Sequence, residues 1–161
     1  MALTLPSIVP SGYAGTSADF QKTKCDKSGA VRLVTGSVTV PASTASGTII
    51  GLFPFNKGAK VSYGSRVYVA DLDTSTNVTL DVGYQYYNSD TGTSQNAGFV
   101  SASTAPQAGG MIEMTAVTSM TFTAAGDGWV IAKIGGGATT TEGAITFNCS
   151  VAYDPSGVTN A

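Results

Sequence analysis

Histidine is absent from this sequence of 161 residues. Its absence excludes Ser-His-Asp and Cys-His catalytic arrangements and removes the side chain most often used as a general base near neutral pH. Nearly all catalytic zinc sites use histidine, and two cysteines alone cannot complete a structural zinc site. The composition therefore argues against an enzyme, and we predict no catalytic, cofactor-binding or metal-ligating residue and no cofactor.

Charged residues are also scarce, at 11% of the chain against about 25% in a typical soluble domain. The formal net charge is −2, and the basic residues are scattered apart from Lys22, Lys24 and Lys27. These lysines lie near Asp19 and Asp26, a mixture typical of a solvated segment rather than of a phosphate-binding patch. We therefore predict no nucleic-acid partner and a surface covered mainly by Ser, Thr and Gly.

Long apolar runs and a secretion signal are missing as well. No stretch reaches the roughly 18 apolar residues of a membrane-spanning helix, so we predict no membrane association. The first residues, MALTLPSIVPSGYAG, lack a basic region and are interrupted by Pro6 and Pro10, which favours synthesis in the cytoplasm without export. Cys25 and Cys149 allow one bridge at most, and Cys149 lies on the apolar face of ITFNCSVAY, which favours a small core residue.

The chain does contain short alternating segments that are separated by turn residues. In NVTLDVGYQYY, apolar residues alternate with Thr79, Asp81, Gly83 and Gln85, as in a strand with one dry and one wet face. WVIAKI is apolar on both faces except at Lys133, which indicates a more central strand. The expected strands are 32–40, 48–53, 66–72, 77–87, 98–102, 111–117, 119–123, 129–134 and 143–153.

No segment of ten or more residues has a convincing helical period. The pattern predicts an all-β fold, an antiparallel two-sheet sandwich with jelly-roll-like topology. We expect an extended N-terminal arm over residues 1–30, the sandwich domain over 31–154 and a flexible C-terminal tail over 155–161. The longest connections, 88–98 and 103–110, should form exposed loops at an end of the sandwich, where recognition often resides.

The glycine run Gly135–Gly137 is the feature closest to a ligand-binding motif. A phosphate loop of the Walker type needs lysine directly after its last glycine and a helix that starts there. Here Lys133 precedes the glycines, and another predicted strand follows at Gly143. The spacing therefore predicts a hairpin turn between two strands.

The carboxylates offer two further candidates, each with a structural alternative. Asp81 and Glu113 lie in predicted strands and could meet across a sheet, although outward-facing, solvated carboxylates are favoured. Asp71, Asp73 and Asn77 carry oxygen ligands that suit calcium, but the EF-hand pattern fails for lack of its glycine and its terminal glutamate. A connection between two strands explains the same residues.

The later part of the chain resembles small structural proteins of tailed bacteriophages. The resemblance covers about residues 66–154 and rests on TSTNVTLDVGYQYY, the polar loop after it, GFVSAST and GDGWVIAKIGGGATTTEGAITFNCSVAYD. Such proteins are commonly capsid decoration (cement) proteins, head fibres or other accessory virion parts. The resemblance implies a β sandwich, often a homotrimer, that binds the outside of a lattice of the major capsid protein.

The hypothesis that follows is a non-enzymatic virion protein at the capsid surface, assembled in the host cytoplasm. Residues 1–30 would contact the capsid or neighbouring subunits, and the loop at 88–98 would face outward. A tail or receptor-contacting component is the first alternative. A carbohydrate-binding β domain is the second, but it would require an aromatic platform that one tryptophan cannot supply.

Overall fold

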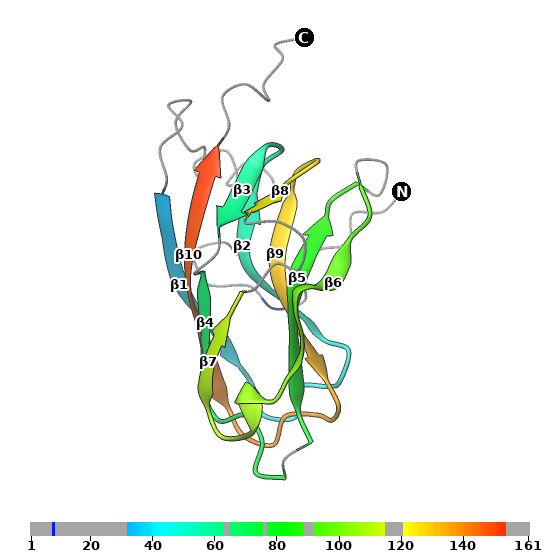
Figure 1. The fold of residues 1–161 in the computed structure, drawn as a ribbon. Coiled ribbons are helices and arrows are strands. Elements are labelled where there is room, and N and C mark those ends of the chain that lie inside the picture. Colours follow the sequence, from blue (N-terminus) through cyan, green and yellow to red (C-terminus); the bar gives the residue numbers. More distant parts are fainter. Residues whose placement is uncertain are drawn as a thin grey trace.

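A computed structural model describes Ile8 and residues 32–62, 65–75, 77–88, 92–114 and 121–153. Two antiparallel sheets pack face to face over a shared core (Figure 1). The predicted all-β sandwich is therefore confirmed. The predicted arm, apart from Ile8, and the predicted tail lie outside the described residues. No helix within the described part of the chain is long and apolar enough to cross a membrane.

The larger sheet is built around the last strand. Its strands are β1 (Arg32–Val40), β3 (Ala59–Ser62), β4 (Arg66–Val69), β7 (Gly110–Glu113), β8 (Thr121–Thr123) and β10 (Gly143–Tyr153). One edge of β10 pairs with β1, and its other edge pairs with β4 and then with β3. The strands β7 and β8 lie beyond β4 and β3 respectively.

The smaller sheet has the order β2-β9-β5-β6. Its strands are β2 (Ile49–Phe55), β5 (Thr79–Tyr86), β6 (Gln95–Ser103) and β9 (Gly128–Gly135). The strand β9 lies between β2 and β5, so the predicted central position of WVIAKI is confirmed. A short 3-10 turn, η4 (Ala105–Gln107), connects β6 to β7.

The strands β3 and β4 act as one interrupted strand. Val61 pairs with Val151 and Arg66 pairs with Asn148, so the β3–β4 segment carries two more residues than the β10 segment opposite it. At this interruption the Ser150 N–H donates a hydrogen bond of 3.1 Å to the Ser65 hydroxyl. The same side of the sheet continues through β8 and β7, which are likewise separated along the chain.

If β3–β4 and β7–β8 are each counted as one strand, the pairings are nested. The first strand pairs with the last, β2 pairs with β9, β3–β4 pairs with β7–β8, and β5 pairs with β6. A long hairpin folded over into two sheets has this pattern, which is the jelly roll. The topology therefore agrees with the jelly-roll expectation.

The inward faces of both sheets supply the core. The predicted dry face of the segment 77–87 is buried at Val78, directly before β5, and at Leu80 and Val82 within it. Phe53 and Phe147 pack with ring centroids 5.6 Å apart. Such burial is the main stabilising contribution in a sandwich of this size. One strand was missed: β3 is only four residues long and follows Pro54 and a turn, so its sequence alternates too briefly to be recognised.

Candidate assembly surface

The outer face of the larger sheet carries the exposed large apolar side chains of the described residues. They are Leu33, Tyr68 and Met111, which are 63%, 43% and 49% exposed. Each lies in a strand of this sheet, at a position that alternates with buried core residues. An exposed apolar patch of this kind commonly marks a surface that contacts another molecule.

Tyr68 and Met111 are direct cross-strand neighbours on this face. The pairing registers place Ser37, Thr146, Tyr68 and Met111 in one row across β1, β10, β4 and β7. The hydroxyls of Ser37 and Thr146 lie 3.1 Å apart and form a hydrogen bond. The row is therefore neutral and hydroxyl-rich at one end and apolar at the other.

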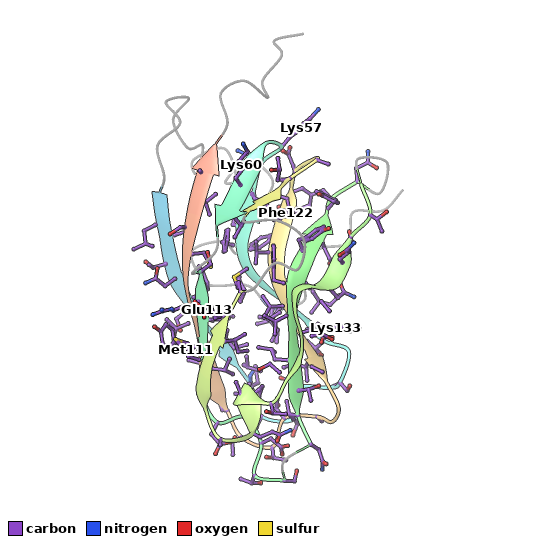
Figure 2. The ribbon with its side chains drawn as sticks, viewed as in Figure 1. Lys57, Lys60, Met111, Glu113, Phe122 and Lys133 are labelled. Atoms are coloured by element: carbon purple, nitrogen blue, oxygen red, sulfur yellow. The ribbon has the colours of Figure 1, made fainter. Side chains whose placement is uncertain are left out.

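The adjacent row brings opposite charges together. Arg66 on β4 pairs in register with Glu113 on β7, and both side chains are exposed. Met111 and Glu113 are labelled beside β7, on the side of the larger sheet that faces away from the smaller one (Figure 2). The apolar pair Tyr68–Met111 thus has a charge-balanced border.

The outer face of the smaller sheet differs in character. Trp129 and Ile131 alternate with the core residues of β9 and yet are 2% and 0% exposed. Lys133 lies opposite Asp81 in the β5–β9 register, and the Asp81 carboxylate accepts a hydrogen bond of 2.7 Å from the Ala102 N–H. The apolar side chains of this face are already covered, so the larger sheet carries the available apolar surface.

Asp81 and Glu113, which could have met across one sheet, lie in different sheets. Asp81 is half-buried and bonded to backbone, and Glu113 is exposed beside Arg66. The structure therefore does not bring them together as a catalytic pair. The solvated alternative is correct for Glu113.

Asp73 organises the connection between β4 and β5. It is buried, and its carboxylate accepts hydrogen bonds from the Ser75 hydroxyl at 2.6 Å, the Asn77 N–H at 2.6 Å and the Val78 N–H at 2.8 Å. The bonds from Ser75, first its hydroxyl and then its N–H, hold the pKa of Asp73 far below its usual range. Both carboxylate oxygens thus stabilise the loop, as the strand-to-strand interpretation of this segment implies.

The glycine run Gly135–Gly137 is not the turn of a hairpin. The strands on either side, β9 and β10, belong to different sheets, so the predicted hairpin is wrong and the segment is a connection between the two sheets. Gly136 has φ = +71°, and the Thr140 N–H bonds to the Leu72 carbonyl at 2.9 Å. The glycines allow the chain to leave β9 and to pack closely against the Asp73 loop.

Cys149 is a fully buried core residue, which confirms its predicted role. Its thiol lies 3.8 Å from the sulfur of Met114, and burial raises the pKa of the thiol to about 12. A thiol in this state is a poor nucleophile. Cys25 lies outside the described residues.

The exposed positions of Leu33, Tyr68 and Met111 were not predicted from the sequence. The signal that could have found them was their parity: each is apolar at a position where an alternating strand faces solvent. Two of the strands, β4 and β7, have only four residues each, so parity could not be assigned from sequence alone.

Comparison with solved structures finds two close matches in fold. A chain of the capsid of Ralstonia phage GP4 is 26% identical, with a TM-score of 0.64 over 81% of this chain and 88% of that one. A chain of the cyanophage Pam1 capsid asymmetric unit is 21% identical, with a TM-score of 0.60 over 77% of this chain and 85% of that one. Both are chains of phage capsids. The resemblance to structural proteins of bacteriophages is confirmed.

No family model matches the sequence, and no curated protein matches it. The capsid neighbours support a phage virion structural protein, and they cover most of the jelly roll rather than one motif. A surface that contacts neighbouring proteins is what such a role requires. The outer face of the larger sheet is the candidate for that surface.

Proposed function

We propose that this protein is a non-enzymatic capsid decoration (cement) protein that binds the lattice of the major capsid protein as a homotrimer. The observation that carries the proposal is the 26% identity to a chain of a phage capsid over 88% of that chain. In this role the protein would join the particle in the host cytoplasm and remain on the outside of the head. The tail and carbohydrate-binding alternatives have no supporting observation of this kind.

Two parts of the molecule are proposed as contacts. One is the predicted arm, residues 1–30, because an extended segment can cover a large surface of a partner when it orders there. Within this chain its Ile8 lies against β2, where the Ile8 carbonyl accepts a hydrogen bond of 2.7 Å from the Gly51 N–H. The other is the outer face around Tyr68 and Met111, which offers apolar area beside the Arg66–Glu113 pair. Apolar burial and backbone pairing would then provide most of the binding free energy.

The low charge of the chain supports binding through apolar burial and backbone pairing rather than through charge attraction. Only 11% of residues are charged, so attraction between net charges contributes little to association. Binding should therefore depend weakly on ionic strength.

The test uses phage particles that lack this protein and to which purified protein is added back. Full-length protein should bind in hundreds of copies per particle. Removal of residues 1–30 should abolish binding while the remaining chain still unfolds cooperatively. The double variant Tyr68→Ser and Met111→Ser should weaken binding at least tenfold, because it removes apolar contact area without disturbing the core.

Two controls separate the contributions. Removal of residues 155–161 should leave binding unchanged, since it shortens the chain at the other end. Replacement of Gln95 and Ser101, both exposed on β6, by alanine should also leave binding unchanged. If the chain without residues 1–30 decorates particles as well as the full chain, the arm assignment is wrong. A total of a dozen copies or fewer per particle would contradict lattice decoration and favour a vertex or tail position.

A further inference from the structure

The edges of the two sheets differ in how they are protected. An exposed edge strand offers unpaired N–H and C=O groups to any other strand, and proteins usually block it with short strands, bulges, proline, charge or a covering segment. The described sheets have four such edges, formed by β1, β2, β6 and the β7–β8 side.

Three of these edges are blocked. The β2 edge contains Pro54 and a register shift, and it is covered at Ile8. The β6 edge has two register shifts, and Ala102 adopts φ = +49°. On the remaining blocked edge, β7 and β8 are only four and three residues long, and β7 ends at Glu113.

The β1 edge has none of these features. The strand is nine residues long, and all nine pair with β10 without a register shift. From Leu33 to Val40 its sequence, LVTGSVTV, contains no proline and no charge. Among the described strands β1 pairs with β10 alone, and it lies at the border of the fold (Figure 1). Leu33 on this strand is the most exposed of the three large apolar side chains.

We propose that the β1 edge pairs antiparallel with β1 of a second copy of this chain, forming one sheet that continues across both copies. This inference does not depend on the proposed capsid role.

The strand is complementary to itself about Gly36. A two-fold axis at Gly36 places Thr35 opposite Ser37 of the other copy and Leu33 opposite Thr39, all on the outer face. On the inner face Val34 would lie opposite Val38 of the other copy, which would cover a valine that is now only half-buried. No like charges meet along Leu33–Val40, so an isologous contact of this kind carries no electrostatic penalty.

An isologous seam closes into twice the starting oligomer when its two-fold axis crosses the symmetry axis of that oligomer. A monomer would become a dimer, and a trimer arranged in this way would be joined to a second trimer. The observable quantity is therefore a mass that falls by half when the seam is broken.

The test is light scattering coupled to gel filtration at low salt, using two charged variants of the full chain. Thr35 and Ser37 are exposed, so Thr35→Lys with Ser37→Lys, and separately Thr35→Glu with Ser37→Glu, should leave the fold intact. Each variant alone places like charges across the seam and should have half the mass of the wild type. An equimolar mixture of the two should recover the wild-type mass, because opposite charges then face each other.

Ala97→Lys with Ser101→Lys is the matched control. It adds the same charge at two exposed positions of β6, whose edge is blocked by its bulges, and should keep the wild-type mass. Thermal unfolding of all variants shows whether each is folded. Equal masses for the wild type and both β1 variants would overturn the proposal. A second outcome would also overturn it: the wild type does not self-associate, and the β1 variants no longer bind the capsid. The strand that pairs with β1 would then belong to another protein.

Discussion

Asp73 shows how one side chain can set the shape of a whole connection. Its carboxylate accepts hydrogen bonds from three residues of the loop that leads into β5, and these bonds stabilise the ionised form. Folding therefore favours the ionised carboxylate, and protonation of Asp73 destabilises the folded protein.

The consequence is a pH dependence of stability. Because the folded-state pKa of Asp73 is lowered, its contribution to the free energy of unfolding is fully present above the unfolded pKa of about 4. That contribution is lost as the pH falls further toward the folded pKa. We expect Asp73→Asn to destabilise the protein at pH 7, and the difference from the wild type to shrink between pH 5 and pH 2.5. Urea denaturation across this range measures the difference.

Glu113→Gln serves as the control, since it removes an exposed carboxylate that lies on β7 opposite Arg66 and is not among the partners of Asp73 given above. A difference between Asp73→Asn and the wild type that stays constant down to pH 2.5 would show that the carboxylate charge does not hold the loop.

For single residues, the sequence predicted burial in the core better than exposure at the surface. Cys149 was assigned to the core because its neighbours on one face were all apolar. Tyr68 carried no comparable signal, since a single apolar residue in a four-residue strand fits either face. Asp73 was recognised as a loop residue, but Thr140, whose hydroxyl donates a hydrogen bond to its carboxylate and whose N–H bonds to the Leu72 carbonyl, approaches only when the chain is folded.

Among the elements, long strands without register shifts were the most predictable, whereas β6, which is equally long but has two register shifts, was predicted only as 98–102 and its first residues were wrongly placed in the loop 88–98. The predicted bounds of 32–40 and 143–153 coincide with β1 and β10, where alternation is long and uninterrupted. The connection after β9 was misjudged, because alternation indicates that a strand has two faces but not which sheet receives it. Two neighbouring strands joined by Gly and Thr fit a hairpin and a crossing between sheets equally well.

The connection between β9 and β10 requires glycine at position 136. Its φ of +71° is unfavourable for other residues, and an added Cβ would overlap the carbonyl oxygen of Asn77. Gly136→Ala should therefore cost about 2–4 kcal/mol, the sum of backbone strain and overpacking. Chemical denaturation of the variant and the wild type measures the loss.

Gly47→Ala is the matched comparison. Gly47 also has a positive φ, of +91°, but no atom lies within 4 Å of a Cβ added there. It should cost only about 1 kcal/mol, the strain alone. Equal losses for the two variants would mean that the contact with Asn77 adds nothing.

For the whole molecule, the nested pairings make the first and last strands depend on each other. β1 cannot pair until β10 has been brought back from the other end of the domain, and such long-range closure slows folding. Nothing in the local sequence indicates this, because the pairing partners lie far apart along the chain. The sandwich and a jelly-roll-like topology could therefore be predicted from the sequence as a class, but the individual strand pairings could not.

A circular permutant tests this dependence. Arg32 pairs with Val151, so a short linker can join Tyr153 to Arg32, with new ends between the exposed residues Ala45 and Ser46. The β1–β10 pair then becomes a local hairpin, which lowers the entropy cost of closing roughly 100 residues by about 2 kcal/mol. Stopped-flow refolding should be roughly tenfold faster than for the unpermuted chain of residues 32–153. An unchanged rate would place β1–β10 pairing after the rate-limiting step.

The β1–β10 register also determines how the domain responds to mechanical load. Arg32 and Val151 lie opposite each other at one end of the β1–β10 pair. A force that pulls residue 32 away from residue 153 therefore breaks the hydrogen bonds between these strands one pair at a time. Strands pulled in this geometry peel apart, whereas strands pulled from opposite ends must break many bonds together. A virion protein of this design would best resist a swelling shell if its attachments lay on the flat of the larger sheet, where force is shared across all of its strands.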